Sequence, residues 1–226
     1  MRTRTDLPPV ERPGLVGIAP SAGRRLLDLG VASLALVLLA PVFAAIWIAI
    51  RATSRGPAIF RQERVGQGGV LFTLYKFRTM RVGGTGPAVT VRGDPRVTRI
   101  GAFLRKTSLD ELPQFVNVLR GDMTLVGPRP ETPDLASRYP APSKAVFRYR
   151  PGMTGPAQLE LRDDRVIPPD IGDLDGFYLT FVAPQRTAVD LQYLEHPTIR
   201  ATVRVLMATF AEVVRPLRGS GPRRSE

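Results

Sequence analysis

An adjacent acidic pair, Asp110-Glu111, lies in the segment TSLDELPQFVNVLRGDMTLVGPRPE at residues 107–131, just before a short amphipathic pattern. The segment ends in Gly127-Pro128-Arg129-Pro130, where two prolines stiffen a turn that presents one arginine. Covalent phosphoryl transfer uses a carboxylate nucleophile, a second acid that helps to hold a metal, and arginines that bind phosphate. These residue types therefore predict phosphoryl chemistry at Asp110 and Glu111.

The acidic pair also has a simpler interpretation. Ser108 and Glu111 have the spacing of a capping box, and acidic residues are common in the first turn of a helix. Asp110 and Glu111 would then only serve a helix N-terminus, where free amides and the helix dipole favour negative charge. Arg105, just before the pair, and Arg129, just after its helix, favour the catalytic interpretation.

Two other basic clusters are candidates for phosphate binding. Lys76 and Arg78 follow a strand-like pattern, although basic residues at a strand end are usually solvated. Arg148, Arg150 and Gln158 belong to FRYRPGMTGPAQ, whose glycines and prolines mark turns that can expose backbone amides to an anion. An ordinary surface loop is the alternative for this second cluster.

The composition restricts which metal ions the chain can bind, but it does not restrict the class of phosphate-containing partner. The net charge is +12, and 29 of the 32 basic residues are arginine, which suits phosphate on nucleic acid, lipid or nucleotide alike. The chain has no cysteine and a single histidine, His196. Thiolate and histidine-rich metal sites are therefore excluded. A metal here is expected to be bound by oxygen, which favours Mg²⁺ or Mn²⁺.

One apolar run near the start of the chain is long enough to enter a membrane. Residues 29–50 carry no charge, Pro41 lies near the middle, and basic residues flank both ends. A helix broken at Pro41 that enters and leaves on one face accounts for all three features. A through-going helix and a cleaved signal peptide are the alternatives, although the run is longer than a typical signal.

The rest of the chain predicts a small α+β domain that is mostly helical. A β-hairpin is expected around Gly66–Gly69, and helices are expected where apolar residues recur at helical spacing, before and after the acidic pair. Apolar residues at 199, 203, 206, 210 and 213 form one stripe of a later helix, which can pack on the core or lie in a membrane interface. We expect a flexible arm at 1–21, a membrane helix at 22–55, a catalytic domain at 56–215 and a disordered basic tail at 216–226.

Four stretches of the chain resemble the bacterial sugar transferases, the monotopic phosphoglycosyl transferases. They are FRQERVGQGG at 60–69, FTLYKFRTM at 72–80, the 107–131 segment, and RYRPGMTGPAQL at 148–159. The resemblance covers roughly residues 22–215, and the third stretch is highly specific. The chain is similar to the minimal members, which carry no large membrane domain ahead of the catalytic one.

The resemblance implies an enzyme that moves a sugar 1-phosphate from a UDP-sugar to a polyprenyl phosphate, such as undecaprenyl phosphate, and releases UMP. It implies that Asp110 is the nucleophile and that Glu111 assists at a dyad that binds Mg²⁺. It also implies a proline-broken re-entrant helix in the inner (cytoplasmic) membrane, with the catalytic domain on the cytoplasmic face. The partners would be the UDP-sugar, polyprenyl phosphate and membrane lipid, without nucleic acid, and a homodimer stays open.

The chain departs from the family pattern at two places. The break reads Ala40-Pro41 where the family commonly has Ser-Pro, so a spanning helix stays an alternative. After Gln158 the chain reads Leu-Glu-Leu-Arg-Asp-Asp rather than towards Asn-Gly-Arg, so no particular sugar is implied. A non-catalytic membrane protein that binds anionic lipid or nucleic acid is the rival function.

Overall fold

The computed structural model describes residues 16–83, 94–161 and 172–214. Residues 1–15 of the predicted arm at 1–21, and the predicted tail at 216–226, lie outside these residues. Ile18, from the end of the predicted arm, forms a parallel bridge with Tyr149 and donates its amide to the Arg148 carbonyl at 2.8 Å.

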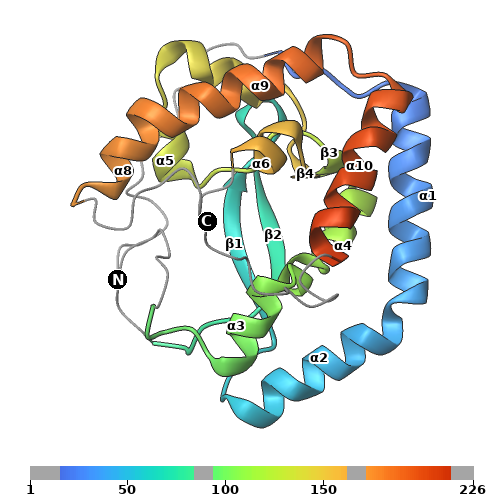
Figure 1. Cartoon of the computed structure of the whole chain (residues 1–226), viewed down its shortest axis with the longest axis vertical. Helices are drawn as coiled ribbons and strands as arrows, with labels where there is room; N and C mark the ends of the chain where they lie inside the picture. Colours follow the sequence, from blue (N-terminus) through green and yellow to red (C-terminus); the bar gives the residue numbers. More distant parts are fainter. Residues whose placement is uncertain (1–15, 84–93, 162–171, 215–226) are drawn as a thin grey trace, which may run out of the picture.

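The predicted hairpin is confirmed and forms the centre of the molecule (Figure 1). Strands β1 (Ile59–Val65) and β2 (Leu71–Phe77) are antiparallel, with Ile59 opposite Phe77 and Val65 opposite Leu71. A 3₁₀ turn, η1 (Gln67–Gly69), connects them, with Gly68 and Gly69 at positive φ. A second, parallel pair joins β3 (Thr124–Val126) to β4 (Gly152–Thr154).

Helices surround the hairpin, as expected for a mostly helical α+β fold. Figure 1 shows α1 (Ala22–Leu38) along one side, α2 (Ala40–Thr53) across one end and α9 (Ala183–Glu195) across the other. The shorter elements are α3 (Arg99–Lys106), η2 (Leu109–Glu111), α4 (Gln114–Arg120), α5 (Pro133–Ser137), η3 (Ala141–Arg148) and α6 (Pro156–Glu160). α8 (Leu174–Phe177) and a π-helical turn, η4 (Tyr178–Val182), lead into α9, and α10 (Ile199–Val214) comes last.

The chain bends sharply where the sequence predicts a break. α1 and α2 meet at Leu39 at an angle of 60°, and Pro41 lies in the first turn of α2. Proline suits that position because the amide it lacks would have no partner in a first turn. Of the helices in the described part of the chain, none is long and apolar enough by itself to cross a membrane; α1 and α2 reach that length and composition only as a bent pair.

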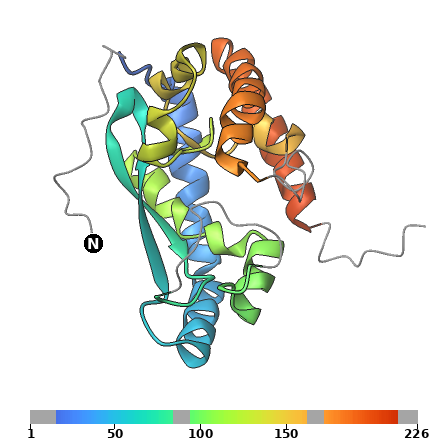
Figure 2. The ribbon, with the colours of Figure 1, turned by 90° about the vertical axis from the view of Figure 1, so that its left-hand side faces the viewer.

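Both bent helices are anchored to the domain on one side. Ile46 and Ile50 of α2 pack with Phe77 and Leu104, and the rings of Phe43 and Phe77 lie 5.5 Å apart. Figure 2 shows α1 running behind the hairpin and α2 near its lower end. Their outer side carries exposed apolar side chains around the bend: Leu34, Val37, Leu38, Val42, Trp47 and Ile48.

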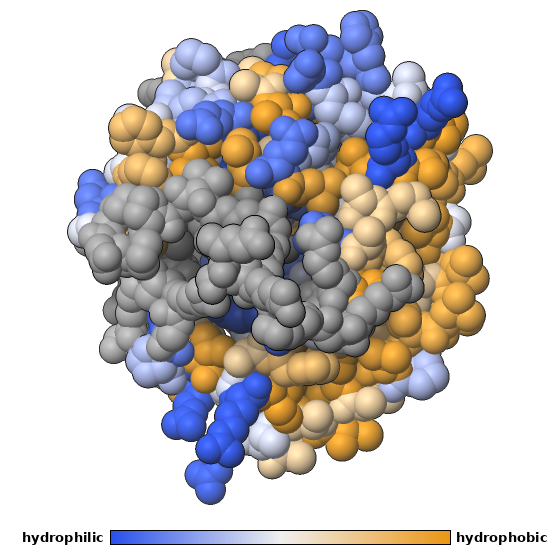
Figure 3. Space-filling model, viewed as in Figure 1, coloured by the Kyte–Doolittle hydropathy of each residue, from blue (hydrophilic) through white to orange (hydrophobic). Residues whose placement is uncertain are grey.

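α10 confirms the predicted helix, and only part of its predicted apolar stripe faces the core. Its inner side is centred on Thr202 and Thr209, whose hydroxyls bond those of Tyr193 and Thr154 at 2.7 Å. Of the predicted apolar stripe, Leu206 packs on the core, whereas Ile199, Val203 and Phe210 are exposed. Figure 3 shows the resulting apolar surface on the side of the molecule that carries α1, α2 and α10.

Candidate active site

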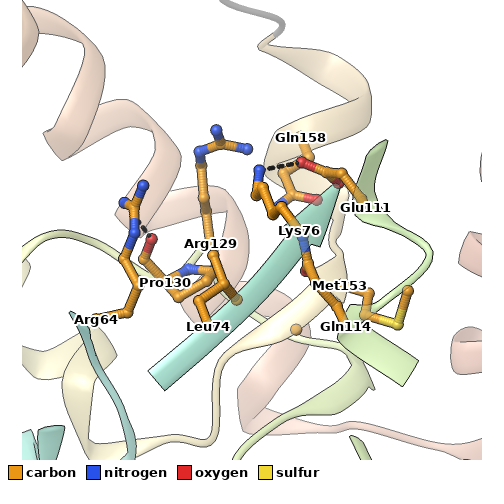
Figure 4. Close-up of a pocket in the computed structure, with 10 residues that line it drawn as sticks. Arg64, Leu74, Lys76, Glu111, Gln114, Arg129, Pro130, Met153 and Gln158 are labelled. Atoms are coloured by element: carbon orange, nitrogen blue, oxygen red, sulfur yellow. Dashed lines mark hydrogen bonds and ion pairs between the residues drawn. The ribbon is translucent and has the colours of Figure 1, made fainter. Parts of the chain in front are cut away.

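An ion pair between the hairpin and the acidic segment marks the site. Lys76, near the end of β2, places its Nζ 2.6 Å from Oε1 of Glu111, and both side chains are partly exposed (Figure 4). Burial alone would raise the pKa of Glu111. The positive charges of Lys76, Arg129 and Arg64 outweigh that effect and lower the pKa below its ordinary value, so this carboxylate stays ionised.

Asp110 precedes Glu111 in the η2 turn and is the more buried of the two, with 9% of its surface exposed. Burial and the neighbouring Glu111 charge raise the pKa of Asp110, whereas Lys76 and Arg105 lower it. The result is a poorly solvated carboxylate beside two cations. Weak solvation makes a carboxylate more reactive towards an electrophile, which suits a nucleophile.

The acidic pair is not at the start of an α-helix, and the predicted capping box is wrong. Ser108 is in the left-handed region at φ 56°, and its side chain makes no capping hydrogen bond. Asp110 and Glu111 instead lie in a single 3₁₀ turn, and α4 begins at Gln114 after Pro113. The simpler interpretation of the pair, as helix-capping residues, therefore loses its structural basis.

Arg129 reaches the site from the turn that follows β3. Close backbone packing fixes this turn, because Gly127 donates its amide to the Thr154 carbonyl and Gly152 donates to that of Pro128. A Cβ at Gly152 would lie 2.1 Å from the Gly127 nitrogen, so only glycine fits there. The Gly152 amide is thus used within the fold and is not presented to an anion. Figure 4 shows the Arg129 side chain between Arg64 and the Lys76–Glu111 pair.

Arg64 is a site residue that the sequence reasoning missed. It donates to the Pro130 carbonyl at 3.0 Å and to Oε1 of Gln62 at 2.7 Å. Its Nε is buried without a hydrogen-bond partner among the described residues. Burial and the nearby Arg129 charge lower the pKa of Arg64. The hairpin register gives a signal for Arg64. Phe60 pairs with Lys76, and residues 60 and 64 point to the same face of β1, so Arg64 and Lys76 lie on one face of the hairpin.

The pocket formed by these residues is small and strongly cationic. Arg64, Lys76 and Arg129 line it together with Glu111 and Gln158, the last of these from α6. Its remaining lining residues are Leu74, Gln114, Pro130, Gly152 and Met153. We call it the dyad pocket. Three cations near a single lining carboxylate leave an excess of positive charge that an anionic ligand would balance.

The other predicted basic residues lie outside this pocket. Arg105 donates to Thr79 Oγ1 at 2.8 Å and acts on Asp110 through its charge. Arg78 is buried and donates to the carbonyls of Ser54 and Arg55 at 2.9 and 2.6 Å, so it fastens the end of α2 to β2. Arg148 is exposed. Burial and the Arg25 charge lower the pKa of Arg150, which lies towards α1.

A fully buried asparagine holds the two halves of the site together. The Asn117 amide nitrogen donates to the Thr73 carbonyl at 2.7 Å, and its oxygen accepts from the Tyr75 amide at 3.1 Å. These bonds fasten α4 to β2 just before Lys76. The distance between the acidic turn and Lys76 is therefore set by a polar core contact rather than by a flexible loop.

Asp110 and Glu111 can hold a metal only together with ligands that the described residues do not supply. Across the described ranges, no group of three or more acidic, histidine or cysteine residues is placed to hold an ion by itself. Asp110 and Glu111 offer two adjacent carboxylates. Mg²⁺ is commonly bound by one or two carboxylates, with substrate phosphates and water completing its shell. The residues present therefore suit a metal that arrives with a diphosphate.

Comparison with known proteins decides the family. The model for bacterial sugar transferases matches residues 19–216. The chain belongs to the bacterial sugar transferase family. The dyad pocket combines residues from all four of the stretches that carry the family resemblance.

Individual relatives in this family have more specific names. The chain is 39% identical over 210 residues to a UDP-glucose:undecaprenyl-phosphate glucose-1-phosphate transferase of Caulobacter vibrioides, covering 90% of this chain and 74% of the relative. It is 47% identical over 118 residues to a putative undecaprenyl-phosphate N-acetylgalactosaminyl 1-phosphate transferase of Bacillus subtilis, covering 51% and 66%. It is 44% identical over 141 residues to a UDP-glucose:undecaprenyl-phosphate glucose-1-phosphate transferase of Escherichia coli. That match covers 60% of this chain and 30% of the relative.

Proposed function

We propose that the chain transfers a sugar 1-phosphate from a UDP-sugar to undecaprenyl phosphate and releases UMP. The observation that carries this proposal is the excess of positive charge at Arg64, Lys76 and Arg129 beside a buried carboxylate. The donor's diphosphate would supply the missing negative charge, and the carboxylate would supply a nucleophile. The names of the three relatives support the same donor and acceptor classes.

The reaction would proceed in two displacements at one phosphorus atom. A carboxylate oxygen of Asp110 attacks the β-phosphorus of the donor, and the bond to the α-phosphate oxygen breaks, so that UMP leaves with that electron pair. A phosphate oxygen of the lipid then attacks the same phosphorus and breaks the bond to Asp110. Arg64 and Arg129 would hold the phosphate oxygens, and Lys76 would keep Glu111 ionised and oriented.

Asp110 and Glu111 would hold Mg²⁺ or Mn²⁺ together with the diphosphate. Such an ion would offset charge on the donor and on the leaving phosphate. Loss of UMP release in EDTA, restored by added Mg²⁺, would support this part of the proposal. Full activity after exhaustive treatment with the chelator would contradict it.

The membrane part of the proposal depends on the bend and on the surface beside it. The bent α1–α2 pair exposes apolar side chains around Pro41, and α10 exposes Val203, Met207 and Phe210 on the same side (Figure 3). A polyprenyl acceptor needs a site at the membrane surface. We therefore place α1 and α2 as a re-entrant element in the inner membrane, with the active site on the cytoplasmic face.

Release of UMP from a panel of UDP-sugars with undecaprenyl phosphate tests the activity directly. Topology can be tested separately because the chain has no cysteine. Single cysteines at the exposed positions Ala22 and Thr53 flank the bent pair. In intact cells, an impermeant thiol reagent should reach neither. Labelling of one position alone would indicate a spanning helix and contradict the re-entrant arrangement.

A further inference from the structure

A second pocket adjoins the dyad pocket and shares two of its residues. Arg129 and Gln158 line both pockets, so they form the boundary between the two. On the far side of this boundary the lining comes from Glu131, from η3, and from α6, η4 and α9. The proposed reaction gives none of these farther residues a role.

The polar lining of this second pocket is built around two buried carboxylates. Tyr139 and Tyr178 donate their hydroxyls to Oε1 of Glu131 at 3.0 and 2.6 Å. Asp190 accepts the Ala157 amide on Oδ1 at 3.2 Å. A carboxylate has about four acceptor sites, so the two hydroxyls on Glu131 and the one amide on Asp190 do not fill either group. Both acids are at least 95% buried and both line the pocket, so a ligand or water there can donate to them.

The remaining lining residues limit the chemistry of such a ligand. Arg186 donates to the Leu161 carbonyl and approaches the Tyr178 hydroxyl, and it also lines the pocket with Thr187. Val146 and Ala157 add small apolar walls. Carboxylate oxygens accept hydrogen bonds from hydroxyl groups and repel phosphate. A lipid chain has no hydrogen-bond donor for the remaining acceptor sites of these carboxylates, which is unfavourable in a buried site.

The shape of the donor places a polyhydroxyl group at this position. In the proposed reaction the attacked β-phosphorus is bonded through one oxygen to the sugar. The sugar must therefore lie directly beside the groups that hold the β-phosphate, one of which is Arg129. A uracil ring fits the two carboxylates less well, because it has a single N–H donor for them, whereas a sugar has several hydroxyl donors.

We propose that this second pocket, with Glu131 and Asp190 as its acceptors, binds the hydroxyl groups of the donor sugar and sets which sugar is transferred. The inference rests on the proposed function. It also gives a structural meaning to α6, because Asp190 fixes the amide of Ala157 and thereby positions the adjacent Gln158 between the two pockets.

Isosteric variants test the proposal in the full chain purified with undecaprenyl phosphate in detergent. Asp190→Asn and Glu131→Gln remove the charged acceptor and keep the shape of the side chain. The kcat/KM is measured for UDP-glucose, UDP-galactose and their N-acetylated counterparts. The inhibition constant of UDP, which lacks the sugar, is measured in the same assay. Asp134→Asn is the matched control, because Asp134 is an exposed carboxylate outside both pockets.

We expect each pocket variant to lower kcat/KM for the preferred donor by about tenfold to a hundredfold, the loss of one charged hydrogen bond. The preference for that donor over its C4 epimer should shrink. Inhibition by UDP should change less than twofold, and Asp134→Asn should behave as the wild type does. Thermal unfolding of each variant checks that it folds.

Three results would overturn the inference. Equal losses for all donors with weaker inhibition by UDP would assign the pocket to the nucleotide. Unchanged kinetics in both pocket variants would make the carboxylates purely structural. UMP release by the wild type with none of the donors would instead refute the proposed function, and the sugar pocket with it.

Discussion

Lys76, near the end of β2, and Arg78, just after it, stand two residues apart, yet the structure gives them opposite roles. Lys76 points into the dyad pocket and pairs with Glu111. Arg78 is buried against the carbonyls of Ser54 and Arg55. The difference lies in position and partner, because Arg78 is buried outside the dyad pocket and both of its terminal nitrogens bond backbone carbonyls at the end of α2. The same contrast separates Arg129 in the dyad pocket from Arg24, which is buried and donates to the Val126 carbonyl.

Among the variants considered, Asp110→Asn is expected to have the largest effect, and it tests the catalytic group of residues. Without a carboxylate nucleophile, UMP release should fall by at least about a thousandfold. Stability should not fall, because burial already raises the pKa of this carboxyl and asparagine carries no charge to desolvate. UMP release and thermal unfolding of the purified variant check both parts. Near-normal turnover would show that another group attacks the donor.

Arg78→Met tests the structural side. The variant leaves the carbonyls of Ser54 and Arg55 without their donor at the end of α2. We expect a loss of about 3 kcal/mol in the free energy of unfolding, seen as a lower melting temperature. The folded fraction should keep the wild-type kcat/KM. Arg81→Met, at an exposed position, is the control. A stable but inactive Arg78→Met protein would move Arg78 into the active site.

Arg129→Lys tests whether the two prolines around Arg129 position a bidentate phosphate contact. Lysine keeps the charge and loses the planar fork, so kcat/KM should fall about thirtyfold, equivalent to about 2 kcal/mol of transition-state stabilisation. The melting temperature should stay near that of the wild type. Arg120→Lys, on the exposed surface of α4, is the control. Unchanged kcat/KM in Arg129→Lys would make the turn structural only.

The sequence predicts the local elements of this fold well because their signals are local. Alternation around a glycine-rich turn identifies the hairpin. Gly121 ends α4 at φ 88°, a left-handed conformation that glycine adopts readily. The acidic pair, the turn of Arg129 and Gln158 are recognised from their motifs, and the structure brings Glu111, Arg129 and Gln158 to one pocket.

The sequence fails where a role depends on a distant partner. Arg78 is fastened to carbonyls 23 and 24 residues away, and no local pattern indicates that contact. Arg64 sits in a recognised motif, but only the hairpin register places it beside the dyad. The inner side of α10 uses the hydroxyls of Thr202 and Thr209, so apolar periodicity alone does not decide which side of this helix faces the core.

The second pocket contains a carboxylate, Asp190, whose ionised form is destabilised by burial. Burial raises the pKa of Asp190 to about 7, because one amide and the nearby Arg186 do not replace its lost hydration. Between its ordinary pKa near 4 and about 7, the folded chain keeps a proton that the unfolded chain releases. Stability should therefore fall as the pH rises through this window.

Asp190→Asn removes that titration and gives the smallest of the four effects. Between pH 6 and pH 8 the wild type should lose roughly 1 kcal/mol of unfolding free energy relative to the variant. Melting temperatures of both proteins across this pH range check the difference, and Asp134→Asn should follow the wild type. Parallel pH curves for the wild type and Asp190→Asn would mean that the Asp190 carboxylate is well solvated or paired in the folded protein. The second pocket would then hold an ordinary carboxylate at Asp190 rather than one that the fold leaves poorly hydrated.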